Sequence, residues 1–136
     1  MVLFRLYADF LRRFYLMEEL KTMARGLQYI DHVIGTGTEV GRGSSFIRVH
    51  YTGWLKNPDG SKGKKFDSSL DRNMPFRYPF NRGYVIQGWD LGLRGMKAGG
   101  RRTLYIPSDL AYGPNGIGGV IPPNADLIFE IEVLEA

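Results

Sequence analysis

Cysteine is absent from the 136 residues of this chain, and histidine occurs only twice. Without thiols, the chain cannot form disulfides, thiolate nucleophiles or sulfur-based metal sites. The two histidines, His32 and His50, are too few for a His-rich metal site and are not spaced four apart as in zinc hydrolases. The sequence therefore predicts a protein with neither a metal ion nor another cofactor.

Long apolar runs and dense charge of one sign are also missing. Arg5, Asp9, Arg12 and Arg13 interrupt the most apolar stretch. It reaches neither the roughly 20 residues of a membrane span nor the about 7–15 of a secretory signal. We therefore expect no membrane span and a cytoplasmic location. The formal net charge is only +4, with one lysine cluster at 62–65. This pattern argues against binding of nucleic acid.

Motifs for covalent catalysis and phosphate binding do not occur. There is no Gly-x-Ser-x-Gly sequence, and the Gly-rich stretch 113–119 lacks the Lys-Ser/Thr ending of a phosphate-binding loop. Asp67, Asp71 and Asp90 stand among basic residues, which favours ion pairing over acid–base catalysis. We interpret His50 as a structural residue on a strand.

Residues 1–26 are predicted to form a helical extension. Residues 3–24 contain neither Gly nor Pro, and apolar side chains recur there at spacings of four and three: Leu3, Tyr7, Phe10, Phe14 and Met17. This spacing predicts an amphipathic α-helix that ends near Gly26. Three interpretations stay open. The helix 1–25 docks on its own domain, it binds a partner or a second copy, or it precedes a true start at Met17 or Met23.

Residues 27–136 are predicted to form one α+β domain. Alternating apolar and polar residues predict strands at 27–34, 46–52, 101–106 and 127–134. Ile86, Trp89 and Leu93 are spaced for one short helix within 85–93. An antiparallel sheet wrapped around this helix is the expected arrangement, with 56–65 as an exposed loop.

Aromatic and branched apolar residues are concentrated in turn-rich segments, where polar residues usually face water. Any one of them alone is best explained as a core residue. Together, from several separated loops, they predict a concave apolar pocket with a few polar groups, as a small-ligand or peptide site requires. The group comprises Tyr51, Phe66, Phe76, Tyr78, Phe80, Tyr84, Trp89, Tyr112, Ile117, Val120 and Ile121.

A series of motifs runs in order through this domain. They are VHYTGWL at 49–55, KFDSS at 65–69, DRN at 71–73, PF at 75–76, VIQGWD at 85–90, MKAG at 96–99, AYG at 111–113, IPPNA at 121–125 and LIFE at 127–130. Over residues 27–136 the sequence resembles the FKBP-type peptidyl-prolyl cis-trans isomerases, which bind the macrolides tacrolimus and rapamycin. The resemblance implies a strongly bent antiparallel β-sheet curled around one short α-helix.

The resemblance also implies roles for individual residues. The expected catalytic residues are Asp67, Tyr112, Trp89 and Phe129, with Trp89 as the floor of the pocket. The expected substrate-binding residues are Tyr51, Phe66, Phe76, Val85, Ile86, Ala111, Ile117, Val120 and Ile121. The backbone N–H of Ile86 and the hydroxyl of Tyr112 would hold substrate carbonyls, and Asp67 would pair with Arg72. Tyr84 and Ile117 depart from the residues common in the family, and both are expected at the pocket rim.

The implied activity is isomerisation of X-Pro bonds in proline-containing peptides and unfolded proteins. Rotation about a peptide bond needs no covalent step, which agrees with the lack of a nucleophile motif. The alternative is a non-catalytic module that holds a proline-containing segment or a macrolide in the same pocket. A scaffold function would rest only on the N-terminal helix.

Overall fold

The computed structural model describes residues 18–41, 43 and 45–136, and in this part of the chain strands are joined by turns and three short helices. The strands are β1 (Leu20–Thr22), β2 (Gln28–Val33), β3 (Phe46–Lys56), β4 (Lys62–Ser68), β5 (Phe76–Pro79), β6 (Arg101–Ile106) and β7 (Leu127–Glu135). The α-helix is α2 (Gln87–Gly92), and the 3₁₀ helices are η1 (Ala24–Gly26) and η2 (Ser108–Leu110). Among these residues, no helix is long and apolar enough to cross a membrane.

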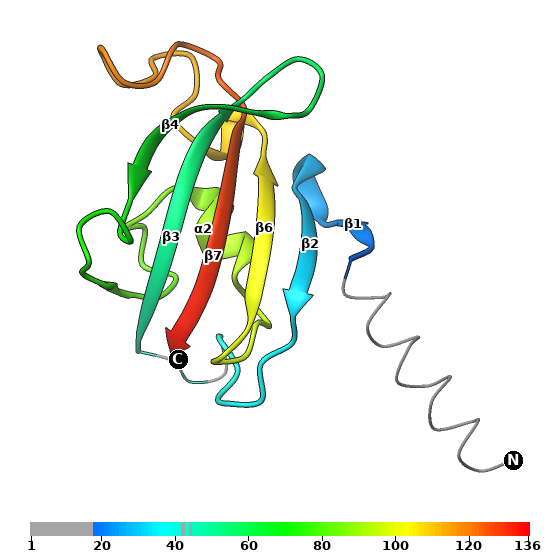
Figure 1. Cartoon of the computed structure of the whole chain (residues 1–136), viewed down its shortest axis with the longest axis vertical. Helices are drawn as coiled ribbons and strands as arrows, with labels where there is room; N and C mark the ends of the chain where they lie inside the picture. Colours follow the sequence, from blue (N-terminus) through cyan, green and yellow to red (C-terminus); the bar gives the residue numbers. More distant parts are fainter. Residues whose placement is uncertain (1–17, 42, 44) are drawn as a thin grey trace, which may run out of the picture.

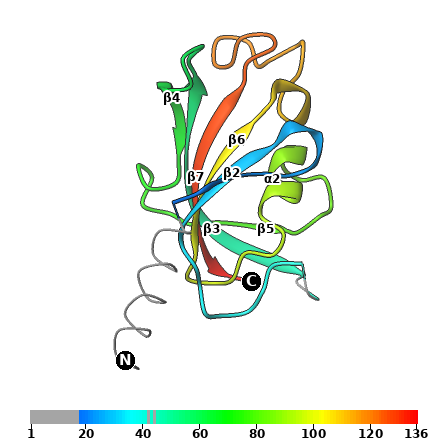
Figure 2. The same cartoon turned by 90° about the vertical axis from the view of Figure 1, so that its right-hand side faces the viewer.

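The strands form one antiparallel sheet in the order β1-β2-β6-β7-β3-β4, and β5 also pairs with β3. Figure 1 shows the sheet from its outer face, with α2 behind it. In the view turned by 90°, α2 lies beside the inner face of the bent sheet (Figure 2). The predicted antiparallel sheet around one short helix is therefore confirmed, and β7 is a central strand as predicted.

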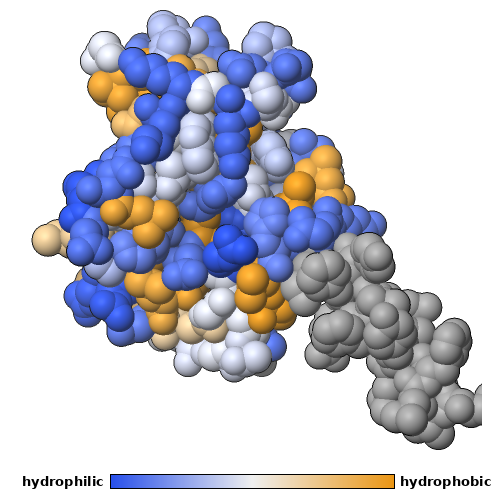
Figure 3. Space-filling model, in the orientation of Figure 1, coloured by the Kyte–Doolittle hydropathy of each residue, from blue (hydrophilic) through white to orange (hydrophobic). Residues whose placement is uncertain are grey.

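Side-chain alternation along β3 explains which face of the sheet turns inward. Ile47, Val49 and Tyr51 are buried, whereas Arg48 and His50 between them are partly exposed. Each buried residue adds apolar area to one shared core, which also contains Trp89 and Leu93 from the α2 region and Ile131 and Val133 from β7. The outer face is largely hydrophilic (Figure 3).

The helix predicted over residues 3–24 is wrong for its last turns. Leu20–Thr22 is strand β1, which pairs with β2 in the register Leu20↔Ile30, and Ala24–Gly26 is a 3₁₀ turn. Pairing with β2 satisfies backbone groups that the edge of the sheet would otherwise leave unpaired, and this tertiary gain outweighs the local helical pattern. The apolar positions from Leu3 to Met17 lie outside the described residues.

The loop predicted at 56–65 is wrong in its second half, because Lys62–Ser68 forms β4. A tight turn joins β3 to β4, with the Asn57 N–H donating to the Ser61 carbonyl at 2.9 Å and Gly60 at a φ of 90°. Glycine and lysine are poor strand formers, so this segment shows no period-two pattern that would predict a strand. Hydrogen bonds to the backbone of β3 stabilise the extended conformation of β4 instead. The short strand β5 was not predicted either.

A buried ion pair joins β2, β6 and the end of α2. Arg102 donates from Nε to Asp31 Oδ1 at 2.6 Å and from Nη2 to Oδ2 at 3.2 Å. Its Nη1 donates to the carbonyl of Gly92 at 2.8 Å. Both side chains are less than a tenth exposed. The Asp31 carboxylate therefore depends on Arg102 for both of these hydrogen bonds.

We predict that Arg102→Met destabilises the fold by about 3–5 kcal/mol, because it leaves the Asp31 carboxylate buried without its partner. Urea unfolding measures this loss. Arg25→Met is the matched control, since Arg25 pairs with Asp109 at 3.7 Å in an exposed site. We expect the control to cost less than about 1 kcal/mol. Equal losses in the two variants would contradict this account.

Candidate functional site

A pocket of about 180 Å³ opens on the side of the sheet that faces α2. Its walls come from β3, β4, β5, β7, α2, the segment before α2 and the loop after η2. Apolar and aromatic side chains predominate among its lining residues, which are Tyr51, Phe66, Asp67, Phe76, Tyr84, Val85, Ile86, Trp89, Tyr112 and Phe129. We call this cavity the Trp89 pocket.

Trp89 is the centre of the aromatic contacts in this pocket. Its ring centroid lies 4.9 Å from that of Tyr51, 5.3 Å from that of Phe129 and 6.3 Å from that of Phe76. The interplanar angles are 74°, 88° and 70°, so all three contacts are edge-to-face, an arrangement that the ring quadrupoles favour. Trp89 is 4% exposed. Rigid aromatic rings thus define the base of the pocket.

Gly53 on β3 makes room for two of the pocket rings. A Cβ atom at this position would come within 2.7 Å of ring atoms of both Phe66 and Phe129. Those two rings lie 5.6 Å apart at an interplanar angle of 87°. The glycine in the VHYTGWL motif is therefore explained by close ring approach, because a larger residue would displace the rings.

Tyr51, Asp67 and Arg72 form a closed hydrogen-bonded group at the edge of the pocket, which we call the polar cluster. The Tyr51 hydroxyl donates to Asp67 Oδ2 at 2.6 Å. Arg72 donates from Nη1 to Asp67 Oδ1 at 2.5 Å and from Nη2 to the Tyr51 oxygen at 2.9 Å. The predicted pairing of Asp67 with Arg72 is confirmed. The cluster joins β3, β4 and the turn that follows β4.

Electrostatics fix the protonation states around the pocket. Burial alone would raise the pKa of Asp67, but the hydrogen bonds from Tyr51 and Arg72 outweigh it and hold that pKa below its usual range. Burial raises the pKa of Tyr51, and its hydrogen bond to Asp67 raises it further. Burial and the nearby Asp67 charge also raise the pKa of Tyr112. At neutral pH the site therefore holds one carboxylate and two neutral phenols.

Most of the residues predicted for the site come together in the Trp89 pocket. The exceptions among the assigned site residues are Ala111, Ile117, Val120 and Ile121, which are not among its lining residues. Tyr78 and Phe80, also predicted to form the pocket, are buried in the core instead. Ile117 and Ile121 pair with each other through two backbone hydrogen bonds of 2.8 and 2.9 Å. Ile121 is buried in the core, whereas Ile117 and Val120 are exposed apolar residues.

Tyr84 lines the pocket, as expected from its place among the aromatic residues predicted to form it, although no binding role was assigned to it. Its side chain is 72% exposed, in agreement with the expected place at the rim. Its position directly before Val85 and Ile86 was the available signal. Of the two expected carbonyl-binding donors, neither the Ile86 N–H nor the Tyr112 hydroxyl has a hydrogen-bond partner among the residues described. The described part of the chain also holds no group of three or more side chains suited to a metal ion.

Comparison with known proteins identifies the family to which this chain belongs. A family model described as FKBP-type peptidyl-prolyl cis-trans isomerase matches residues 37–134. The chain belongs to this family of isomerases. Among FKBP-type relatives, the FK506-binding protein of Neisseria meningitidis serogroup B is 54% identical over 110 residues, covering 81% of this chain and 95% of the relative. FK506-binding protein 1 of Saccharomyces cerevisiae is 43% identical over 101 residues, covering 74% and 84%.

Solved structures of FKBP-type proteins have the same fold. AtFKBP13 matches with a TM-score of 0.74 at 38% identity, over 87% of this chain and 99% of that one. FkpA from Escherichia coli also matches with a TM-score of 0.74 at 38% identity, over 94% of this chain and 56% of that one. The activity class inferred from the sequence motifs, peptidyl-prolyl cis-trans isomerisation, is confirmed at the level of the family.

We predict that Arg72→Met raises the pKa of Asp67 toward its ordinary value, because it removes a hydrogen bond and a positive charge from the carboxylate. A lowered folded-state pKa stabilises the protein above the unfolded pKa, and this contribution is lost as pH falls. The wild type should thus lose more stability than the variant between about pH 5 and pH 2. Carboxyl ¹³C titration and urea unfolding across that range measure the two effects. Lys65→Met is the control, since Lys65 pairs with Asp71 at 2.7 Å instead. An unchanged Asp67 titration in Arg72→Met would contradict the assignment.

Proposed function

We propose that the Trp89 pocket accelerates rotation of X-Pro bonds by desolvating and positioning the substrate amide. The observation that carries this proposal is the edge-to-face aromatic cluster of Tyr51, Phe76, Trp89 and Phe129 around an open cavity. Amide resonance creates a rotational barrier of about 18–20 kcal/mol, while cis and trans X-Pro forms differ by only about 0.5–1 kcal/mol. The protein therefore has to raise the rate of interconversion and does not have to shift the equilibrium between the two forms.

An apolar pocket lowers this barrier without covalent chemistry. The planar amide has a large resonance dipole, which water solvates well. The twisted transition state loses resonance and much of that dipole, so transfer from water into an aromatic cavity disfavours the planar form more than the twisted form. Each reduction of about 1.4 kcal/mol in the barrier accelerates rotation tenfold. No proton transfer is required.

Two donors at the pocket are suited to hold the chain on either side of the rotating bond. We assign the Ile86 N–H and the Tyr112 hydroxyl to substrate carbonyls, which confines rotation to one bond. Asp67 either acts on the twisting amide through its charge or only orders the turn that carries Arg72. Ala111, Ile117, Val120 and Ile121 remain proposed contacts for the residues flanking proline.

The proposed ligands are proline-containing peptides, unfolded proteins, tacrolimus and rapamycin. The names of the Neisseria and yeast relatives state that those proteins bind FK506, the compound also called tacrolimus. The similarity between those relatives and this chain supports binding of such macrolides here. The cytoplasm remains the location predicted from the sequence.

The decisive experiment is NMR exchange spectroscopy on a short Leu-Pro-Phe peptide, with and without rapamycin. We expect cis-trans exchange to accelerate in the presence of the protein and to return to the uncatalysed rate when rapamycin is added. Macrolide binding without acceleration would instead identify a non-catalytic binding module. Acceleration that rapamycin does not inhibit would contradict placement of the activity in the Trp89 pocket.

We predict that Trp89→Leu lowers kcat/KM at least about tenfold, because the variant loses the floor that shapes the cavity. Tyr112→Phe should lower kcat/KM by about fivefold through loss of one hydrogen bond. Tyr105→Phe on β6 is the matched control and should keep wild-type activity, because Tyr105 lies outside the pocket.

Asp67→Ala tests the electrostatic contribution separately. We expect this variant to lose a larger fraction of its turnover than of its unfolding free energy. Turnover is measured in the same exchange assay and stability by urea unfolding. If Asp67→Ala and Tyr112→Phe both retained the wild-type rate, desolvation alone would account for catalysis.

A further inference from the structure

Tyr84 is the most exposed of the residues that line the Trp89 pocket. It is 72% exposed, compared with 37% for Tyr112. Within the described part of the chain, the Tyr84 ring makes no aromatic contact and its hydroxyl has no hydrogen-bond partner. An aromatic ring that faces water at the opening of a pocket leaves apolar area that a ligand can cover. Tyr84 therefore presents a ring that the fold itself does not use.

Asp90 on α2 fixes the loop that carries Tyr84. Its Oδ1 accepts the Asn81 N–H at 3.1 Å, and its Oδ2 accepts the Gly83 N–H at 3.4 Å. Gly83 has a φ of 73°, a backbone conformation that favours glycine. Ile86, on the other side of Tyr84, packs against the core. The exposed position of the Tyr84 ring is therefore set by the fold, because the chain is held both before and after it.

Tyr84 lies close to one of the two donors that we assign to the substrate. The Ile86 N–H is two residues away along the chain, a separation of at most about 7 Å. A substrate residue whose carbonyl accepts that N–H is within reach of the Tyr84 ring. Phe66 of β4 lines the pocket from the other side, since β4 and the loop between β5 and α2 lie on opposite sides of the domain (Figure 2). Only one of the two residues that flank proline therefore meets Tyr84.

We propose that Tyr84 is a specificity-determining residue of the isomerase, whose ring stacks on an aromatic side chain next to proline in the substrate. This inference rests on the proposed function of the Trp89 pocket. Two aromatic rings attract each other in offset-stacked or edge-to-face geometry, and a tyrosine with two side-chain torsions loses little entropy in such a contact. The contact lies away from the rotating bond, so it is equally strong in the ground state and in the transition state. It therefore lowers KM and leaves kcat unchanged.

The charge beside Tyr84 favours an aromatic partner over a cationic one. Arg82 is exposed and forms no ion pair with any of the described residues. The Asp90 carboxylate is engaged by the two N–H groups of the loop. A lysine or arginine of the substrate that approached the Tyr84 ring would be repelled by Arg82, whereas a neutral ring is not.

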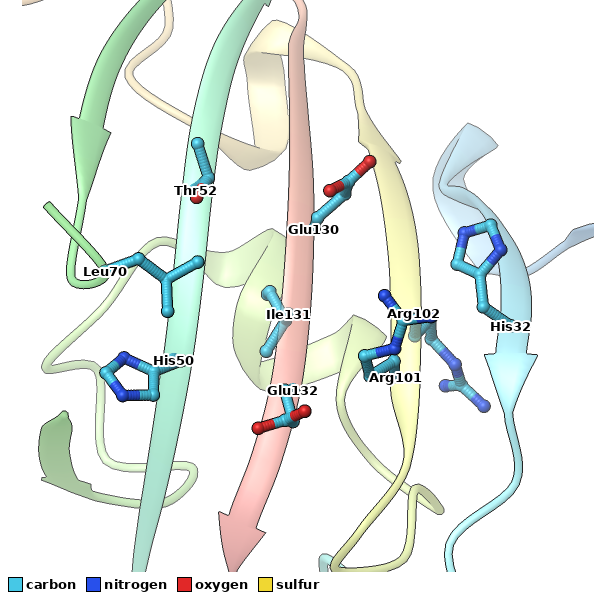
Figure 4. Close-up of a pocket in the computed structure, with 9 residues that line it drawn as sticks. All are labelled: His32, His50, Thr52, Leu70, Arg101, Arg102, Glu130, Ile131 and Glu132. Carbon is cyan, nitrogen blue, oxygen red and sulfur yellow. The ribbon is translucent and has the colours of Figure 1, made fainter.

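A second cavity, on the outer face of the sheet, does not offer this contact. It is a groove of about 350 Å³ that is lined mainly by residues of β2, β3, β6 and β7 (Figure 4). Its lining contains no phenylalanine, tyrosine or tryptophan. Its two histidines already have partners, His32 in Thr103 at 2.6 Å and His50 in Ser69 at 2.8 Å. A preference for aromatic substrates therefore points to the Trp89 pocket.

Three variants separate the ring of Tyr84 from its hydroxyl and from unspecific effects. Tyr84→Phe keeps the ring and loses the hydroxyl. Tyr84→Ala loses both. Phe46→Ala is the matched control, because Phe46 at the start of β3 is also an exposed aromatic residue, at 45%, but does not line the pocket.

NMR exchange spectroscopy at several peptide concentrations gives kcat and KM for each variant. Leu-Pro-Leu is the reference peptide. Leu-Pro-Phe and Phe-Pro-Leu each place one aromatic residue beside proline, and Leu-Pro-Arg and Arg-Pro-Leu place a cation there. These peptides test both flanking positions and both kinds of partner.

We expect Tyr84→Ala to raise KM about fivefold for one of the two aromatic peptides, the effect of one lost ring contact. Its KM for the other four peptides should change less than about twofold, and kcat should stay constant. Tyr84→Phe and Phe46→Ala should keep the wild-type KM for every peptide. Equal changes in KM for all peptides, a change that follows the arginine peptides, or a fall in kcat at constant KM would overturn the proposal.

Nuclear Overhauser effects between the Tyr84 ring and the phenylalanine ring of the bound peptide test the contact without reference to turnover. We expect them for the same aromatic peptide whose KM depends on Tyr84, and their absence at saturating peptide would overturn the proposal. If the wild type binds that peptide through Tyr84 but does not accelerate exchange, the proposed function fails and the contact stands. If exchange is accelerated with the same KM in the wild type and in Tyr84→Ala, the function stands and this inference fails.

Discussion

Contact between Trp89 and the inner face of the sheet is the interaction on which the fold and the pocket both depend. The indole packs edge-to-face against Tyr51 of β3 and Phe129 of β7, so one side chain from α2 spans the two central strands. The same rings that bury the helix against the sheet form the base of the cavity. Stability and function therefore draw on the same side chains, and the pocket floor is as rigid as the core.

Around this apolar base, Asp67 and Arg72 have defined partners. Tyr51 and Arg72 each donate to one oxygen of Asp67, which orients the carboxylate at the rim. Within the core, Arg102 neutralises Asp31 and also binds the carbonyl at the end of α2. The polar groups thus fix the positions of elements whose packing is otherwise non-directional.

Much of this arrangement was predictable from the sequence, because the informative positions obey local rules. Alternating apolar and polar residues identified β3 and β7 as strands. The spacing of Ile86, Trp89 and Leu93 identified the helix. The ordered motifs identified most of the pocket lining through resemblance to a family. Leu20–Thr22 and Lys62–Ser68 were missed, because pairing with a neighbouring strand decides their structure. Tyr84 was expected at the rim and lies there, but its sequence position alone assigned it no binding role. The contact of His50 on β3 with Ser69, directly after β4, joins positions 19 residues apart and has no sequence signature.

Gly53 has a consequence for the ways in which this site can change. Its neighbours on the pocket side are the rings of Phe66 and Phe129, one from an edge strand and one from a central strand. Substitution of Gly53 cannot change the shape of the pocket in small steps, because the first added carbon, Cβ, already meets both rings. Changes in ligand preference are then confined to positions where a side chain, and not the backbone, forms the surface of the pocket. Tyr84 at the rim is such a position. The inner wall of the pocket therefore has a fixed shape, and differences in ligand recognition arise from the loops around the pocket opening.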